Sequence, residues 1–259
     1  MLIKSDNFTN EEIEKMRRAG RVIAELYDEF REVLHAGMTG LEANDWFAKN
    51  IRAKGARASY AHDPDAVGFP GVVCISVNDT VVHGAPNGEE FAKGDLVSLD
   101  LVVDIDGMCA DAAITYCVDE EPKGAKKLLM RETEKSLYAG IDAIRYKNGV
   151  VEIGEISRAV EKVLNRAGLG IVRDLVGHGI GREMHQAPDI PNYFDRRMND
   201  RTPVGNAIAI EPMATLGTYK VVQRNPNGWD YDTADGSLAA HFEHTILLTE
   251  DGPEIITKL

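Results

Sequence analysis

Asp100 and Asp111 flank the predicted turn Asp104-Ile105-Asp106-Gly107 of a β-hairpin, at a spacing that would let both carboxylates bind a metal ion. With Ile105 and Asp106 at the centre of the turn, Asp100 pairs directly with Asp111; with the centre at Asp106-Gly107, the two carboxylates are diagonal on one face. Like charges in apolar surroundings need a cation between them, and a divalent ion suits carboxylate oxygens. The alternative, hydrogen bonds from loop amides or an arginine, fits these two residues equally well.

Three further segments place possible ligands in apolar or glycine-rich settings. His178 lies in the motif Gly177-His178-Gly179-Ile180-Gly181, where glycines let the backbone and the ring approach a ligand closely. Glu211 ends an apolar strand before a proline, and Glu243 lies within another apolar strand. Each alone has a plainer interpretation, a tight turn for the glycine motif and a paired core residue for Glu243. Taken with the aspartates, they are poorly explained as a solvated surface.

The composition excludes several classes of protein. The 259 residues are 44% apolar and 27% charged, with a net charge of −13, which excludes disordered and disulfide-dense chains. The acidic balance disfavours binding of nucleic acid or anionic membrane by bulk charge. Cys74, Cys109 and Cys117 form an odd set without a C-x-x-C pair, which is typical of the cytoplasm. No run approaches the roughly 20 apolar residues of a membrane span.

Hydrophobic periodicity predicts the same order of elements twice. The expected helices lie at about residues 10–36, 41–53, 123–145 and 151–167, and the expected strands of the first half at about residues 72–77, 80–82, 96–104 and 108–118. Each half has helices first and strands second, which predicts one pseudo-symmetric α+β unit with halves of about residues 1–121 and 122–259. Residues 60–71, rich in proline and glycine, are expected to form an inserted surface loop.

Five separated blocks resemble those of a known family, in the family's order. They are Val82-His83-Gly84-Ala85-Pro86, Asp100 with Asp111, Gly177-His178-Gly179-Ile180-Gly181, Ile210-Glu211-Pro212-Met213 and Phe242-Glu243-His244-Thr245. From about Glu11 to the C-terminus the chain resembles the type I methionine aminopeptidases, in their bacterial-type short form, of peptidase family M24. The resemblance implies the pita-bread fold, a curved antiparallel sheet of two pseudo-symmetric halves with outer helices, forming a single catalytic domain over residues 1–259.

The resemblance also implies a ligand set and an activity. Asp100, Asp111, His178, Glu211 and Glu243 would hold two divalent ions of cobalt, manganese, iron or zinc, with Asp111 and Glu243 bridging them. Asp100 would hold the first ion, and His178 with Glu211 the second. The implied reaction removes the N-terminal methionine from nascent proteins and peptides with a small second residue, through a metal-bound hydroxide. Glu211 is the better candidate for the general base, because a monodentate carboxylate keeps one oxygen free.

Further residues match substrate-contacting positions of the family. His83 would contact the substrate amine or the scissile amide, with loop capping as the alternative, and His185 would stabilise the developing oxyanion. The methionine side chain would lie among aromatic and sulfur-containing residues. These are Phe69, Cys74, Met184 and Trp229.

Some positions depart from the family's pattern, and two other functions stay open. Ala110 and Ala112 stand where the family often has glycine before and threonine or serine after the second aspartate, and Val102 stands where many members have threonine two residues after the first. These changes remove hydrogen bonds around the ligands and are expected to alter metal affinity without removing a ligand. The first alternative is an Xaa-Pro aminopeptidase or prolidase-like metallopeptidase. The second is a non-catalytic pita-bread scaffold, which the presence of all five ligands disfavours. A monomer without an added zinc-finger segment is expected, and the basic stretch 123–131 is either a solvated helix face or a transient contact with ribosomal RNA.

Overall fold

The computed structural model describes residue 2 and residues 7–61, 66–197 and 200–259, and its first helix begins at a complete capping box. Helix α1 (Asn10–Arg31) starts after Thr9, whose hydroxyl accepts from the Glu12 amide, while the Glu12 carboxylate accepts from the Thr9 amide at 2.8 Å. The predicted end near Gly37 is wrong. The Gly37 amide donates to Phe91 O at 2.8 Å, which draws the chain away from the helix axis after Arg31.

The other elements follow the predicted order. The helices are α2 (Gly40–Ala53), α3 (Gly124–Asp142) and α4 (Ile153–Ala167), and Ser59–Ala61 forms one turn of 3₁₀ helix. The strands of the first half are β1 (Arg57–Ala58), β2 (Cys74–Val77), β3 (Thr80–Val82), β4 (Leu96–Ile105) and β5 (Met108–Cys117). Those of the second half are β6 (Tyr146–Lys147), β7 (Val150–Glu152), β8 (Gly170–Ile171), β9 (Gly177–Ile180), β10 (Gln186–Ile190), β11 (Arg201–Pro203), β12 (Ala207–Ile210), β13 (Met213–Thr215), β14 (Val221–Val222), β15 (Tyr231–Thr233), β16 (Ala239–His241), β17 (His244–Thr249) and β18 (Gly252–Ile255).

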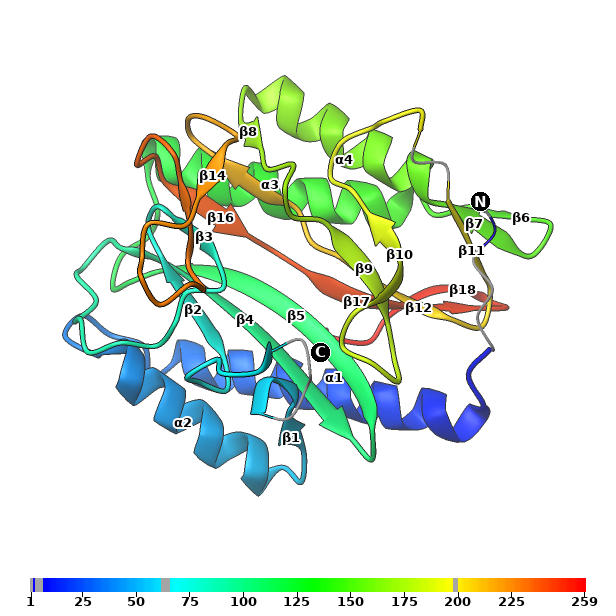
Figure 1. Cartoon of the computed structure of the whole chain (residues 1–259), viewed down its shortest axis with the longest axis horizontal. Coiled ribbons are helices and arrows are strands. Elements are labelled where there is room, and N and C mark those ends of the chain that lie inside the picture. Colours follow the sequence, from blue (N-terminus) through cyan, green and yellow to red (C-terminus); the bar gives the residue numbers. More distant parts are fainter. Residues whose placement is uncertain (1, 3–6, 62–65, 198–199) are drawn as a thin grey trace.

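The antiparallel sheets lie between two pairs of helices, as expected for a pita-bread fold. Strands β1, β4 and β2 form one sheet, with β5 on the free side of β4, and β10, β9, β12, β17 and β18 form another. In Figure 1, α1 and α2 run below the strands of the first half, and α3 and α4 run above those of the second half. Helix α1 packs on β4 and β5, and α3 packs on α4 and β16.

The β4–β5 hairpin adopts the second of the two predicted registers. Asp100 pairs with Ala113 and Val102 pairs with Asp111, so the two aspartates are diagonal on one face. Asp106 and Gly107 have φ angles of 51° and 81°, and two left-handed residues in succession form the turn type that matches the twist of a hairpin. This turn sets the register.

The predicted surface loop at residues 60–71 is partly wrong. Residues 62–65 of that loop lie outside the described residues. Tyr60 and Ala66 are buried, because their side chains pack into the same apolar cluster as Val73 and Cys74. This segment therefore contributes to the interior of the first half.

Two threonine hydroxyls link strands of the two halves. The Asp111 amide donates to Thr245 Oγ1 at 2.9 Å, and this hydroxyl donates to the Asp111 carbonyl at 2.7 Å. The His241 amide donates to Thr115 Oγ1 and the same hydroxyl donates to the His241 carbonyl, both at 2.9 Å. Each hydroxyl satisfies two backbone groups where the strands do not form a regular ladder. Within the described residues no helix is long and apolar enough to span a membrane.

Replacing Thr245 with valine is expected to destabilise the protein by about 1–3 kcal/mol. The change keeps the side-chain volume but leaves the amide and carbonyl of Asp111 without their buried partner. Urea unfolding followed by circular dichroism measures the loss. Thr245→Ser, which keeps the hydroxyl, is the matched control, and equal stability of the two variants would contradict the role given to the hydroxyl.

Candidate metal centre

The β4–β5 hairpin carries the first two predicted ligands into the interior. Asp100 and Asp111 are both buried, and their carboxylates share one face of the hairpin. The Tyr60 hydroxyl donates to Asp100 Oδ2 at 3.3 Å. The Thr245 hydroxyl binds both the amide and the carbonyl of Asp111. The backbone of both ligands is therefore fixed by strand pairing, independently of any cation.

Two glycines explain the motif around His178. A Cβ atom at Gly177 would lie 2.4 Å from Ala209 O, and one at Gly179 would lie 2.3 Å from Ala187 O. Only glycine permits this approach of β9 to its neighbours β12 and β10. The Nδ1 atom of His178 lies 2.9 Å from the carbonyl of Gly179. An Nδ1–H donated to that carbonyl leaves the lone pair of Nε2 free to bind an ion.

Glu211 and Glu243 extend from the ends of strands toward the same point. Glu211 directly follows β12, and its carbonyl accepts from Asn192 Nδ2 at 3.0 Å. Glu243 lies between β16 and β17, and its amide donates to Ala113 O at 2.9 Å. Both side chains are buried.

The structure brings the predicted ligands together. One ligand atom from each of Asp111, His178 and Glu243 lies within 4.8 Å of the other two. His178 Nε2 is 3.4 Å from Glu211 Oε1 and 3.7 Å from Asp111 Oδ2. Asp100 completes the set from the same face of the hairpin. These residues, far apart in the sequence, surround one buried point.

Burial and mutual repulsion disfavour the charged forms of the carboxyls. Burial raises the pKa of Asp100 to about 6. For Asp111, burial and then the charges of Glu243 and Asp100 hold the pKa well above its usual range. Burial and neighbouring carboxylates likewise raise the pKa values of Glu211 and Glu243. Burial lowers the pKa of His178 to about 3, so this imidazole is neutral. Added positive charge, or further hydrogen-bond donors, would stabilise such a set in its ionised form.

The donor atoms fit a divalent metal. Within the described part of the chain, Asp100 Oδ1, Asp111 Oδ1 and Glu243 Oε1 are buried and have no hydrogen-bond partner. Among the described residues, the basic side-chain nitrogen atoms within 4.0 Å of the Asp111, Glu211 and Glu243 carboxylates belong to histidines and not to arginine or lysine, so the arginine alternative is not supported. Carboxylate oxygens with one imidazole nitrogen suit iron, manganese, cobalt or zinc.

A second group of contacts holds His83 beside this point. His83 has a φ of 57°, a left-handed conformation that costs energy for a non-glycine residue. The Ala85 amide donates to Asp230 Oδ1 at 2.8 Å, and the Gly84 amide donates to Ser76 Oγ at 3.1 Å. The His83 ring packs edge-on against Tyr231, with centroids 5.7 Å apart. The neighbouring hydrogen bonds therefore hold His83 in its strained conformation.

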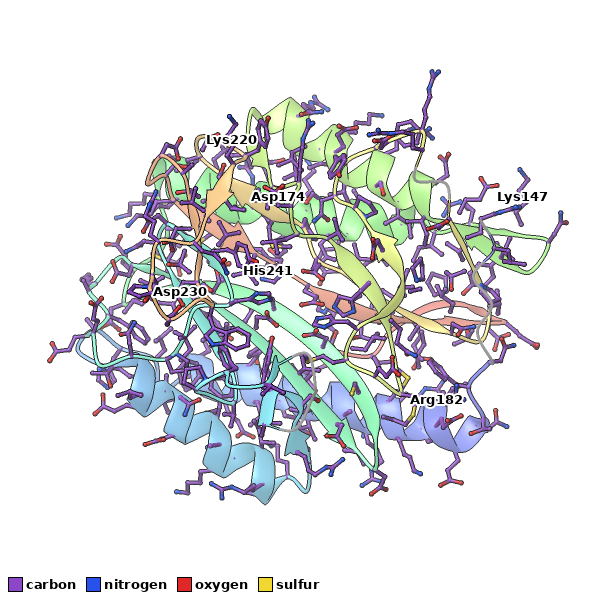
Figure 2. The ribbon with its side chains drawn as sticks, viewed as in Figure 1. Lys147, Asp174, Arg182, Lys220, Asp230 and His241 are labelled. Carbon is purple, nitrogen blue, oxygen red and sulfur yellow. The ribbon has the colours of Figure 1, made fainter. Side chains whose placement is uncertain are left out.

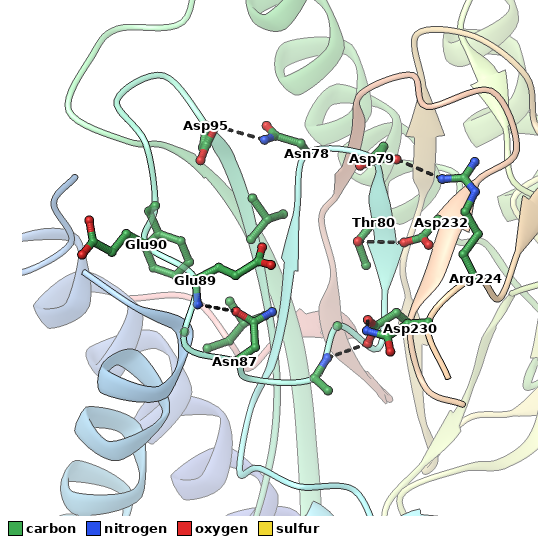
Figure 3. A pocket seen from close by; sticks show the side chains of 17 residues that line it. Asn78, Asp79, Thr80, Asn87, Glu89, Glu90, Asp95, Arg224, Asp230 and Asp232 are labelled. Carbon is green, nitrogen blue, oxygen red and sulfur yellow. Dashed lines mark hydrogen bonds and ion pairs between the residues drawn. The ribbon is translucent and has the colours of Figure 1, made fainter. Parts of the chain in front are cut away.

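A cavity of about 530 Å³ lies behind this loop but contains none of the predicted ligands. Gly84, Ala85 and Asp230 line it, together with several acids (Figure 3). Three of these acids have side-chain partners: Asp95 accepts from Asn78, Asp232 accepts from Thr80, and Asp79 pairs with Arg224 at 3.2 Å. Asp230 is the acid of this lining that holds the His83 loop, through its bond from the Ala85 amide.

The remaining predicted substrate residues are placed in two groups. Phe69 packs between Tyr60 and Trp229, with centroids at 5.0 Å and 5.3 Å, and Cys74 pairs with Asp100 across β2 and β4. Met184 is buried, whereas His185 is exposed with its ring 4.4 Å from that of His178. Arg182 binds Glu12 through two hydrogen bonds of 2.6 Å and 2.9 Å, which tethers the loop of Met184 and His185 to α1.

Sequence reasoning gave no role to two residues at the site, Tyr60 and His241. The hydroxyl of Tyr60 contacts a predicted ligand, but its segment was expected at the surface. His241 is buried at the centre of the molecule (Figure 2), with Nε2 3.6 Å from Glu211 Oε2 and 4.0 Å from Glu243 Oε2. The alternation of side chains along a strand, which puts His241 on the same side as Glu243, was the available signal.

The positions that depart from the family pattern are apolar and fully packed. Val102, Ala110 and Ala112 are buried in the apolar cluster of the first half. The carbonyl of Ala112 accepts from the Tyr27 hydroxyl at 2.6 Å. Asp111 is instead fixed through its backbone by Thr245.

Comparisons with known proteins identify the family of this chain. The model of metallopeptidase family M24 matches residues 14–250. A methionine aminopeptidase of Clostridium perfringens is 37% identical over 259 residues, covering 100% of this chain and 99% of the relative. The crystal structure of methionine aminopeptidase from Thermotoga maritima has a TM-score of 0.90 and 37% identity, covering 99% of this chain and 100% of that one. The prolidase of Pyrococcus furiosus shares the fold, with a TM-score of 0.75 and 21% identity, but this chain covers only 65% of it. The chain therefore belongs to metallopeptidase family M24, among the methionine aminopeptidases.

Proposed function

We propose that this protein removes the N-terminal methionine from nascent proteins and from peptides whose second residue is small. The observation that carries the proposal is the convergence of Asp100, Asp111, His178, Glu211 and Glu243 on one buried point. The relatives named methionine aminopeptidase match over nearly their whole length, whereas the prolidase has only 21% identity, which shows a shared fold alone.

In the proposed mechanism, two divalent ions would be held by Asp100, Asp111, His178, Glu211 and Glu243. Metal ions bound there would supply Lewis-acid chemistry, lowering the pKa of a water molecule and polarising the scissile carbonyl. Glu211 accepts the proton of the attacking water on its free oxygen and delivers it to the departing amine as the carbon–nitrogen bond breaks. His83 binds the substrate amine or amide, and His185 donates a hydrogen bond to the oxygen that gains charge.

Specificity is proposed to come from the aromatic and sulfur-containing groups near Asp100. Phe69 and Trp229 present ring edges and faces, and a thioether packs favourably on both. Burial raises the pKa of the Cys74 thiol, so this side chain is a neutral contact. Met184 completes the apolar wall.

The cellular setting follows from the same proposal. We place the protein in the cytoplasm as a monomer that meets polypeptide N-termini, with at most a transient contact between the basic face at residues 123–131 and the ribosome. The described residues include three free cysteines, which suits a reducing compartment. The whole chain, residues 1–259, is proposed to act as one catalytic domain.

The metal-loaded protein is expected to release methionine from Met-Gly-Met-Met and to leave Xaa-Pro peptides intact. Chromatography of the products after loading with manganese, cobalt or iron tests this activity. Turnover of Xaa-Pro peptides with no release of methionine would contradict the assignment, and no turnover with any metal would favour the scaffold function.

His178→Ala is expected to lower turnover by more than about 100-fold, because even residues that only orient a ligand change affinity or activity 10- to 100-fold. The variant loses the imidazole nitrogen that lies 3.4 Å from Glu211 Oε1. Metal titration by calorimetry should show weaker binding. Retention of full activity and affinity would contradict the proposed ligand set, and His35→Ala, an exposed histidine outside the site, is the matched control.

The metal-free protein is expected to lose stability as the pH rises above about 6.5, the ordinary pKa of histidine. The pKa values of Asp111, Glu211 and Glu243 are raised in the folded protein, so these carboxyls bind protons more tightly there than in the unfolded chain. Proton binding therefore stabilises the folded state, and this contribution to the free energy of unfolding is lost as the carboxyls ionise. His178, with its lowered pKa, is neutral in both states over this range and adds no slope. Thermal unfolding with and without manganese tests this, and an equal slope in both would contradict it.

A further inference from the structure

His241 is a buried imidazole to which the proposed mechanism assigns no role. Neither ring nitrogen has a hydrogen-bond partner among the described residues, and both are shielded from solvent. An imidazole nitrogen left unpaired in the interior costs free energy, so an alternative partner at the site is expected. The Nε2 atom faces Glu211 Oε2 at 3.6 Å and Glu243 Oε2 at 4.0 Å.

The two oxygens of Glu211 face different imidazoles. Oε1 lies 3.4 Å from Nε2 of His178, and Oε2 lies 3.6 Å from Nε2 of His241. His178, Asp111 and Glu243 have ligand atoms close enough together to share an ion. Among the described residues, His241 is not part of this group. Oε1 therefore points toward the proposed ions, and Oε2 is the oxygen left for the proton.

The backbone of both residues is held firmly enough to make this contact specific. One hydroxyl, that of Thr115, binds the amide and the carbonyl of His241, and it is itself 2.8 Å from Ser98 Oγ. The carbonyl of Glu211 accepts from Asn192. The distance from His241 Nε2 to Glu211 Oε2 exceeds that of a normal hydrogen bond by about half an ångström, which a small rotation of either side chain would remove. Hydrogen bonds from N–H donors to ionised acceptors are about 2.7–2.9 Å long.

We propose that His241 is a positioning residue, whose Nε2–H donates to Glu211 Oε2 and holds this oxygen where it takes the proton from the attacking water. The inference rests on the proposed function for its effect on turnover, but the hydrogen bond itself does not depend on turnover. Both the neutral ring protonated on Nε2 and the charged ring present this donor, so the contact does not require a change of charge.

Three substitutions of His241 separate this role from a structural one. His241→Leu removes the donor, His241→Gln places an amide N–H near the position of Nε2, and His241→Asn places one near Nδ1 instead. With saturating manganese and Met-Gly-Met-Met, the leucine variant is expected to lose about 10- to 100-fold in kcat, part of the 10²–10⁴-fold effect of general acid–base catalysis. KM should stay within about threefold, and glutamine, but not asparagine, should restore most of kcat.

Metal affinity distinguishes a positioning residue from a metal ligand. Calorimetric titration of each variant with manganese should give dissociation constants within about threefold of the parent. A loss of more than about tenfold in affinity would overturn the proposal, as would an unchanged kcat in His241→Leu or equal rescue by asparagine. Circular dichroism and thermal unfolding check that each variant is folded.

A crystal structure of the zinc-loaded protein tests the contact without reference to activity. The expected Nε2 to Oε2 distance is about 2.7–3.1 Å, whereas a zinc ligand would place Nε2 about 2.0–2.1 Å from the ion. A separation from Glu211 above about 3.5 Å, or a bond to the ion, would overturn the inference. The hydrogen bond without release of methionine would overturn the proposed function alone, and release without the hydrogen bond would overturn the inference alone.

Discussion

The repulsion among Asp100, Asp111, Glu211 and Glu243 is the constraint on which the rest of this structure depends. Buried together, these groups favour the protonated form, as their raised pKa values show. Their geometry cannot come from attraction to one another, so it must come from the backbone. The backbone supplies that geometry before any cation binds. It does so through strand pairing, through the close approach of β9 at its two glycines and through the threonine contacts.

The threonine contacts cross between the two halves of the chain. Thr245, in the second half, holds the backbone of Asp111 in the first, and Thr115, in the first half, holds that of His241 in the second. Each half thus fixes a residue of the site that the other half carries. Loss of the contact between halves would disturb the ligand geometry and the packing together, which couples the site to global stability.

Residue types and order predicted which side chains the fold brings together, whereas they left parts of the local conformation undecided. Four acids and a histidine in apolar or glycine-rich segments are poorly explained as a solvated surface, and the resemblance to the family's blocks implied that they bind metal. The hairpin register was left between two choices, because only the left-handed conformations at Asp106 and Gly107 decide it. The predicted end of α1 was wrong, because the hydrogen bond between Gly37 and Phe91 joins residues 54 positions apart. Helical periodicity is a local pattern and carries no information about such a contact.

The same limit explains why Tyr60 and His241 were missed. A proline- and glycine-rich segment indicates a surface loop, and nothing local to Tyr60 shows that its hydroxyl reaches Asp100. His241 ends the short strand β16, and a break separates it from β17, so the alternation with Glu243 spans two strands. The residues next to His241 in the sequence do not show what its ring contacts. Its ring faces Glu211 as well as Glu243, and Glu211 lies far away in the sequence. Alternation carried across strand ends is therefore a better guide to such residues than the composition of one strand.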